Sequence, residues 1–171
     1  MARVSDRRIG VGMSGHQAAQ GVTDEWYTPP SIFDALGIPF DLDPAAPRGG
    51  VDWVPASEHF SIDDNGLAKP WRGRVWLNPP YGSQTGIWLG KLADHGDGIA
   101  LVFARTDTAW FQSCAARAWS ICFVAGRIRF LRPDGTPGNY TGGAPSCLLA
   151  FGRECAVAVQ DCGLGVVGSV Q

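Results

Sequence analysis

The sequence predicts an α/β fold with a mixed sheet, in which parallel strands come first and antiparallel strands follow toward the C-terminus. Up to about residue 118, short apolar runs alternate with helical patterns, as is typical of parallel strands joined by helices. After about residue 120, apolar stretches are separated by turns that contain Gly or Pro, which indicates antiparallel strands. The chain of 171 residues is long enough for one domain with a substantial core.

We expect a flexible arm over residues 1–21 and a single domain over residues 22–171. The arm is rich in Gly and Arg and has no apolar periodicity. Between the expected elements lie loops, with a short element near residues 60–62. The expected helices cover residues 32–36, 86–95 and 108–118, and the expected strands cover residues 40–43, 75–77, 99–103, 121–124, 127–131, 146–151 and 155–159.

Composition argues against several classes of protein. No apolar stretch is long enough to span a bilayer, and the N-terminus lacks the apolar core of a signal peptide, so we expect a cytoplasmic protein. The 3 histidines lie far apart and the 5 cysteines lack metal-ligand spacing, so we expect reduced thiols and no metal site. A formal net charge of −2 argues against binding of nucleic acid through bulk charge and leaves local basic patches open.

The most informative motif is Asn78-Pro79-Pro80-Tyr81, which follows the predicted strand at residues 75–77. A rigid Pro-Pro turn at the end of a strand holds an amide and an aromatic ring at the edge of the sheet. The amide oxygen of Asn78 and the carbonyl of Pro79 can each accept one N–H of an exocyclic amine, while Tyr81 can stack on the attached ring. The motif therefore predicts a pocket for a planar base that carries an amino group, with a purely structural turn as the alternative.

A second candidate site lies at the end of the predicted strand at residues 40–43, where Asp43 precedes Pro44. The carboxylate of Asp43 can pair with the α-amino group of a ligand. The small Ala45 and Ala46 allow the backbone to approach that ligand closely. An aspartate that only begins a turn is the alternative.

Three blocks of the sequence are informative together, namely Trp26-Tyr27-Thr28-Pro29, Phe40-Asp41-Leu42-Asp43-Pro44-Ala45-Ala46 and Trp76-Leu77-Asn78-Pro79-Pro80-Tyr81. In this order they resemble the small phage-type DNA N-6-adenine methyltransferase (Dam) family. The resemblance covers roughly residues 23–151. It implies a compact Rossmann-like class I methyltransferase fold and the transfer of a methyl group from S-adenosylmethionine to N6 of an adenine that is flipped out of DNA. It also implies a bacterial host cell and a phage or prophage origin.

The candidate residues for the cofactor surround these blocks. Thr28 and Pro29 can line the carboxylate of the methionine part, with a helix cap and a first-turn proline as the alternative. Asp63 or, equally, Asp64 can bind the ribose hydroxyls or the target amine, with an ordinary turn as the alternative. The full candidate set is Trp26, Tyr27, Thr28, Pro29, Asp43, Pro44, Ala45 and Asp63.

The candidate residues for nucleic acid follow the predicted turn at residues 125–126. Arg127 and Arg129 alternate with Ile128 on a predicted strand, so we expect both to contact phosphate or to line the base pocket. Phe130, or a tryptophan such as Trp110, can hold the other face of the base, with core packing as the alternative.

One departure from the family pattern keeps other functions open. The larger relatives carry a Gly-rich turn where this chain has Asp43-Pro44-Ala45-Ala46. The stretch between the predicted strands at residues 40–43 and 75–77 is also short, so we expect one helix-strand unit of the family pattern to be missing, together with its ribose-binding carboxylate. The alternatives are another amino acceptor, namely cytosine N4, an RNA base or a protein amide, and a DNA-binding module that has lost catalysis. The sequence leaves the oligomeric state open.

Overall fold

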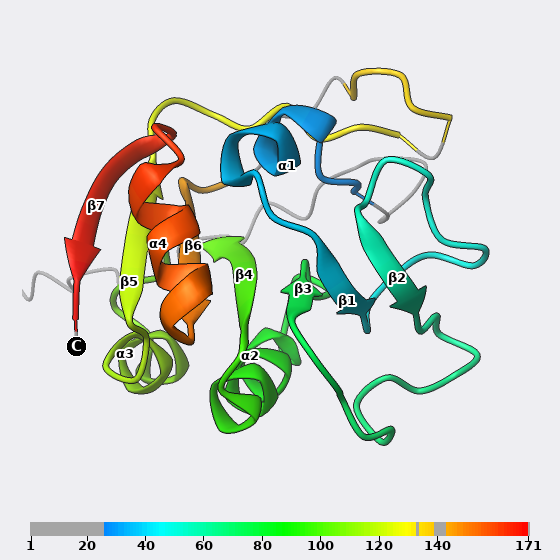
Figure 1. Cartoon of the computed structure of the whole chain (residues 1–171), viewed down its shortest axis with the longest axis horizontal. Coiled ribbons are helices and arrows are strands. Elements are labelled where there is room, and N and C mark those ends of the chain that lie inside the picture. Colours follow the sequence, from blue (N-terminus) through cyan, green and yellow to red (C-terminus); the bar gives the residue numbers. More distant parts are fainter. Residues whose placement is uncertain (1–25, 133, 139–142, 171) are drawn as a thin grey trace, which may run out of the picture.

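The computed structural model describes residues 26–132, 134–138 and 143–170, and the predicted N-terminal arm lies outside them (Figure 1). These residues form a seven-stranded mixed sheet with helices on both faces, which confirms the predicted α/β class. The elements are α1 (Pro30–Leu36), β1 (Phe40–Asp43), β2 (Ala56–His59), β3 (Val75–Leu77), α2 (Thr85–His95), β4 (Gly98–Phe103), α3 (Ala109–Ala115), β5 (Ser120–Val124), β6 (Ser146–Phe151), α4 (Arg153–Asp161) and β7 (Gly165–Ser169).

The strand order β2-β1-β3-β4-β6-β5-β7 creates a crevice at the centre of the parallel half of the sheet. Strands β1 to β4 run parallel, and β6 is antiparallel to both β4 and β5, so the predicted antiparallel C-terminal strands are confirmed. The chain leaves β1 toward β2 on one side and returns to β3 on the other side. Ligands of open α/β sheets bind where the chain reverses in this way, at the carboxyl ends of the strands.

Two apolar clusters, one on each face of the sheet, hold the layers together. Val75 and Leu77 of β3 pack in the cluster that contains α2 and α3, whereas Trp76 packs in the cluster that contains α1 and α4. This alternation follows from the two-residue period of a strand. The ring centroids of Trp76 and Phe33 are 4.7 Å apart, so β3 anchors α1 beside the crevice.

Residues 155–159 were predicted to be a strand, and this prediction is wrong because they belong to helix α4. The apolar run is continuous, and such a run fits a strand or a helix equally well. In the helix, Cys155, Ala156 and Val159 are buried at helical spacing, while Val157 is 50 % exposed. Strand geometry would place Val157 on the same face as Cys155 and Val159.

Residues 127–131 were also predicted to be a strand, but they form no strand of the sheet. The alternation itself is present, because Ile128 and Phe130 are buried while Arg127 and Arg129 are exposed. Only Leu131 pairs as a strand would, in an isolated antiparallel bridge with Tyr27. The position beside β5 is occupied instead by β7, a strand that we did not expect.

No helix or strand covers residues 60–62, where a short element was expected, and strand β2 precedes them at Ala56–His59. It supplies the outer parallel strand of the sheet, and the segments that connect it to β1 and β3 contain no helix. Among the described residues, none of the helices has the length and apolar character needed to cross a bilayer.

Candidate active site

A cavity of about 680 Å³ opens at the carboxyl ends of β1 and β3, where the strand order predicts a binding site. This volume falls within the range of small-molecule sites, about 300–1,000 Å³. The cavity brings together the two motifs that the sequence singled out. The lining residues predicted from the sequence are Trp26, Tyr27, Thr28, Asp43, Pro44, Ala45, Asn78, Pro79, Pro80 and Tyr81.

The amide of Asn78 has a defined orientation at the end of β3. Its Nδ2 donates a hydrogen bond to the backbone carbonyl of Trp26 at 3.0 Å. Its Oδ1 accepts a hydrogen bond from the hydroxyl of Tyr81 at 3.1 Å. A carbonyl oxygen has two lone pairs, so Oδ1 can accept a second hydrogen bond from a ligand in the cavity.

The turn that follows Asn78 is fixed to the start of α2 by Thr85. The Thr85 hydroxyl donates to the carbonyl of Pro80 at 2.9 Å and accepts from the backbone N–H of Gly82 at 3.1 Å. The carbonyl of Pro80 is therefore already engaged, which favours the carbonyl of Pro79 as the acceptor for a ligand. Sequence analysis missed Thr85, although a threonine at the start of a predicted helix is a typical capping signal.

Asp43 lies at the end of β1 and is 6 % exposed. Burial raises the pKa of its carboxyl to about 7, because the charged form loses hydration, and the hydrogen bond from the backbone N–H of Ala45 at 3.1 Å opposes this only in part. An ionised Asp43 therefore needs a cationic partner. A cationic group of a ligand in the cavity supplies one.

The segment before α1 forms another wall of the cavity. Thr28 is 2 % exposed, and its Oγ1 has no hydrogen-bond partner among the described residues. Its backbone carbonyl accepts a hydrogen bond from Nε1 of Trp53 at 2.9 Å. Pro29 is the N-cap residue of α1 and is not among the residues that line the cavity, and the first-turn proline is Pro30, one position later than the capping alternative placed it.

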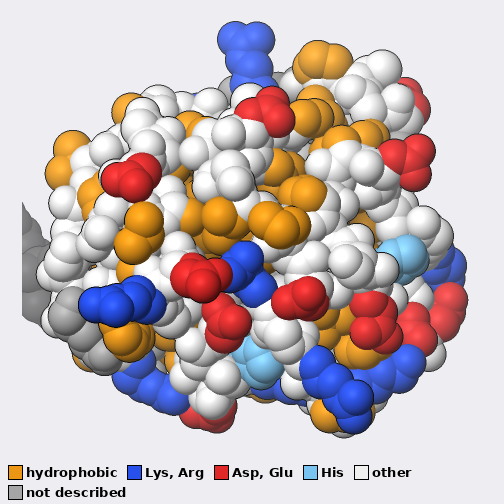
Figure 2. Space-filling model, in the orientation of Figure 1, with side chains coloured by type: hydrophobic (Ala, Val, Ile, Leu, Met, Phe, Trp, Pro, Cys, Tyr) orange, Lys and Arg blue, Asp and Glu red, His pale blue; other side chains and the backbone are white. Residues whose placement is uncertain are grey.

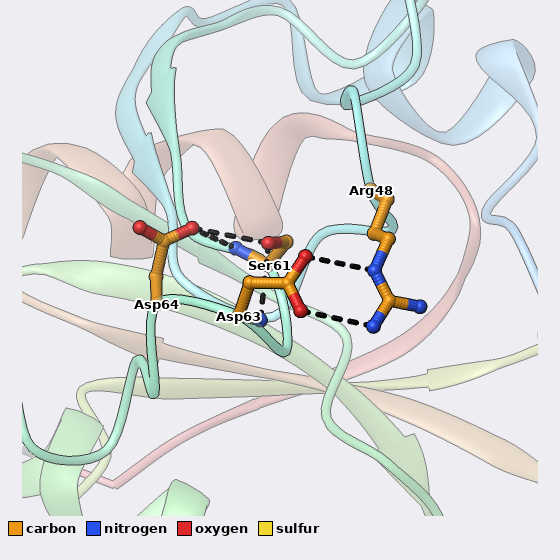
Figure 3. A network of polar contacts seen from close by, with 4 residues as sticks. All are labelled: Arg48, Ser61, Asp63 and Asp64. Carbon is orange, nitrogen blue, oxygen red and sulfur yellow. Dashed lines mark hydrogen bonds and ion pairs between the residues drawn. The ribbon is translucent and has the colours of Figure 1, made fainter.

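Asp63 and Asp64 lie on the loop at residues 61–67, and their carboxylates bind protein groups (Figure 3). Asp63 forms an ion pair with Arg48, in which Nε and Nη2 of Arg48 contact both carboxylate oxygens, and this contact lowers the pKa of Asp63. Lys69 and then Ser61 hydrogen-bond Asp64 and lower its pKa to about 2. Neither aspartate lines the cavity in this conformation.

Other residues of the same loop do line the cavity, namely Ser61, Ile62, Asn65, Gly66 and Leu67. The loop packs directly on the corner that contains Asp43. A Cβ atom at Gly66 would lie 2.1 Å from the carbonyl oxygen of Pro44, so only glycine fits there. Sequence analysis missed Ser61, Asn65 and Gly66 because their role depends on the path of the loop in space.

Comparison with known protein families shows to which family this chain belongs. The family model described as DNA N-6-adenine-methyltransferase (Dam) matches residues 15–159, which is most of the chain. The chain belongs to the Dam family. No curated protein and no solved structure matches it. The chain is therefore a DNA methyltransferase by family, and its sheet is compatible with a compact methyltransferase fold.

In this Dam-family chain the residues predicted to contact DNA lie beside the cavity and do not line it. Arg127 and Arg129 are exposed on the segment that leads to Leu131, and Leu131 pairs with Tyr27 of the cavity wall. Phe130 is 1 % exposed and packs edge to face with Tyr81 at a centroid distance of 6.3 Å, so it lies in the core in this conformation. Trp110 packs against Phe111 and does not line the cavity.

Trp88 is a further aromatic residue in the wall of the cavity of this Dam-family chain. Trp88 of α2 lines the cavity, is buried, and its Nε1 has no hydrogen-bond partner among the described residues. The sequence indicated only an apolar helix face at this position.

The described part of the chain contains no cluster of His, Cys, Asp and Glu side chains that fits a metal ion, and its five cysteines are free and buried.

Proposed function

We propose that this DNA methyltransferase transfers a methyl group from S-adenosylmethionine to the N6 amino group of adenine in DNA. One observation carries the proposal: a single cavity contains both the buried carboxyl of Asp43 and the oriented amide of Asn78. The first group suits the amino acid part of a cationic cofactor, and the second suits an exocyclic amine.

The residues of the cavity fit S-adenosylmethionine. Asp43 would hold its α-amino group, because a buried carboxyl with a raised pKa gains most from a cation. Thr28 is the candidate for its carboxylate, since its buried hydroxyl has no partner among the described residues. Ser61 and Asn65 are the candidates for its ribose hydroxyls. When bound, this cofactor supplies an electrophilic methyl group on a sulfonium.

Asn78 and Pro79 would then act on the adenine amine. The lone pair of N6 is delocalised into the ring, which makes the amine a poor nucleophile. Asn78 Oδ1 accepts one N–H and the Pro79 carbonyl accepts the other, and this geometry favours a tetrahedral nitrogen with a localised lone pair. Preorganised acceptors and positioning supply the rate acceleration, and Asn78, whose amide stays neutral, forms no covalent intermediate.

Asn78→Ala is the first test of this proposal. We expect a loss of about 10²–10³-fold in kcat, the size expected when one aligned polar group is removed from an active site. Affinity for the cofactor should stay within a factor of about two by calorimetry, since Asn78 is assigned to the base. The measurement is mass spectrometry of nucleosides from DNA that was incubated with isotope-labelled cofactor, with Gln160→Ala on the exposed face of α4 as the control.

The same measurement separates the other acceptors. Methylated cytosine, methylated RNA or a methylated protein amide in place of N6-methyladenine would replace the proposed substrate. A wild-type protein that binds no cofactor would instead favour a DNA-binding module without catalysis. Methylation of adenine by Asn78→Ala at the wild-type rate would show that Asn78 does not hold the amine.

We also propose where the enzyme contacts DNA and where it works. Arg127 and Arg129 are exposed beside the cavity wall, which suits contacts to the phosphates that flank a flipped base. The resemblance to phage-type enzymes supports a phage or prophage origin and action in the cytoplasm of a bacterial host.

A further inference from the structure

Tyr81 has two contacts that its stacking role does not require. Its ring stacks on Phe103 with a centroid distance of 4.1 Å and an interplanar angle of 20°. Its hydroxyl donates a hydrogen bond to Oδ1 of Asn78 at 3.1 Å. One face of the Tyr81 ring is therefore covered by protein, and its polar end is committed to the amide in the cavity.

The amide of Asn78 has two possible orientations, which differ by exchange of its oxygen and its nitrogen. The carbonyl of Trp26 accepts hydrogen bonds and cannot donate them, so it favours the orientation in which Nδ2 faces it. The Tyr81 hydroxyl fixes the oxygen from the other side by donating to it. Only this orientation presents an acceptor to a substrate amine.

We propose that Tyr81 is a positioning residue that acts through Asn78, and that its hydroxyl holds Oδ1 so that one lone pair faces the substrate amine. This inference rests on the proposed function. The hydroxyl occupies one of the two lone pairs of Oδ1 and leaves the other for one N–H of the substrate. The carbonyl of Pro79 then accepts a hydrogen bond from the second N–H of the substrate.

Two features support this role of the Tyr81 hydroxyl and make Tyr81→Phe a specific test of it. Burial raises the pKa of the Tyr81 hydroxyl, so it stays protonated throughout the working pH range. The stack on Phe103 and the edge contact with Phe130 hold the ring in place without help from the hydroxyl. Tyr81→Phe therefore removes the donor and keeps the packing of the ring.

Steady-state kinetics of Tyr81→Phe tests the proposal. We expect kcat to fall about tenfold, the effect of one lost hydrogen bond, while KM for DNA and the cofactor Kd stay within about twofold. If the ring acts only by stacking on the base, Tyr81→Phe keeps the wild-type kcat and only Tyr81→Leu loses activity. That result overturns the proposal, and so does a rise in KM for DNA at unchanged kcat.

Ser113→Ala is the matched control, because it also removes one hydroxyl hydrogen bond, to the carbonyl of Trp110 at 3.1 Å, on the exposed side of α3. It should leave kcat unchanged. Thermal unfolding of both variants shows whether either one loses the fold.

NMR of the full chain without ligand gives a readout that does not need activity. We expect the side-chain NH2 resonances of Asn78 to shift and to exchange faster with solvent in Tyr81→Phe, and to keep their wild-type behaviour in Ser113→Ala. Unchanged Asn78 resonances in Tyr81→Phe overturn the positioning role. If wild-type protein methylates no adenine, the proposed function fails, and the NMR experiment still decides whether Tyr81 orients the amide.

Discussion

Asp43 is a carboxylic acid placed where its charged form is poorly solvated. Its folded-state pKa, about 7, lies above the ordinary value of 3.8, so the folded protein binds this proton more tightly than the unfolded chain. In the protein without ligand, the contribution of Asp43 to stability is complete below its unfolded pKa and is lost as the pH rises toward about 7. A cation in the cavity reverses this preference, because it stabilises the carboxylate.

Cofactor affinity should therefore depend on pH through Asp43. We expect the affinity for S-adenosylhomocysteine, which keeps the α-amino group, to fall by up to about tenfold per pH unit below about pH 7, as the carboxyl becomes protonated. At higher pH it should fall again, once the α-amino group of this free amino acid loses its proton. Calorimetry from about pH 5.5 to about 8 measures the dependence that Asp43 causes.

Two variants control this measurement. Asp43→Asn should bind weakly and lose the dependence below pH 7, whereas Asp34→Asn on the exposed side of α1 should behave like wild type. A wild-type affinity that stays flat from pH 5.5 to 7 would assign the amino group to another residue.

At the scale of single residues, the sequence predicted the groups that stand at the ends of strands. Asp43 is the last residue of β1 and Asn78 directly follows β3, and the carboxyl ends of parallel strands converge on one site. Asp63 illustrates what the sequence could not resolve. Its partner Arg48 is fifteen positions away, and only the folded loops bring the two side chains together.

At the scale of elements, two loops rather than helices form the wall of the cavity nearest β2. The first follows β1 and includes residues 44–51, and the second covers residues 61–67. The ion pair of Arg48 with Asp63 joins the two loops (Figure 3). Lys91 of α2 also holds the second loop, through hydrogen bonds from Nζ to the carbonyls of Gly66, Leu67 and Lys69 at 2.6–3.1 Å.

A comparison of Arg48→Ala with Asp63→Asn tests whether this ion pair is a bridge between loops or Asp63 is a cofactor ligand. If it is a bridge, both variants should raise the Kd for S-adenosylhomocysteine to the same extent, with little change in Tm, because exposed ion pairs contribute little to stability. The double variant should then be no weaker than either single one. A much larger loss for Asp63→Asn would show that its carboxylate binds the ribose, as the sequence predicted.

The sequence predicted the elements best where the apolar pattern fitted only one type of secondary structure. The strands at β1, β3 and β4 and helix α2 were placed within one residue at either end. Helix α4 was misread because its apolar run fits a strand as well as a helix. Strand β7 was missed because Gly165 and Gly168 weaken its strand pattern, and its pairing with β5 is a tertiary choice.

At the scale of the whole molecule, the charge distribution limits how this enzyme can bind DNA. The formal net charge is −2, and Figure 2 shows acidic and basic side chains interspersed on one face without a large field of one sign. Long-range attraction to the phosphate backbone is therefore weak. We therefore expect a few local cations, such as Arg127 and Arg129, to supply most of the phosphate contacts.

Replacement of Arg127 and Arg129 by alanine should reduce the salt dependence of DNA binding. Each lost phosphate contact should lower the slope of log K against log salt by about 0.9, and thus the pair by about 1.8. Fluorescence anisotropy at several salt concentrations measures the slope, and cofactor affinity should not change. Arg153→Ala is the control, because α4 begins beside the amino end of β4, away from the cavity. An unchanged slope in the double variant would place the phosphate contacts elsewhere.

Asn65 lines the cavity with a φ of 53°, and among the described residues it is the one non-glycine with a positive φ. Glycine adopts this left-handed geometry without the steric cost that a Cβ atom brings. Selection for heat resistance alone would therefore favour glycine at this position, and the wall of the cavity would then lose the Asn65 side-chain amide. Because Asn65 is a candidate for binding the cofactor ribose, we expect Asn65→Gly to raise the Tm and to weaken cofactor binding, so a search for thermostable variants should leave this position unchanged.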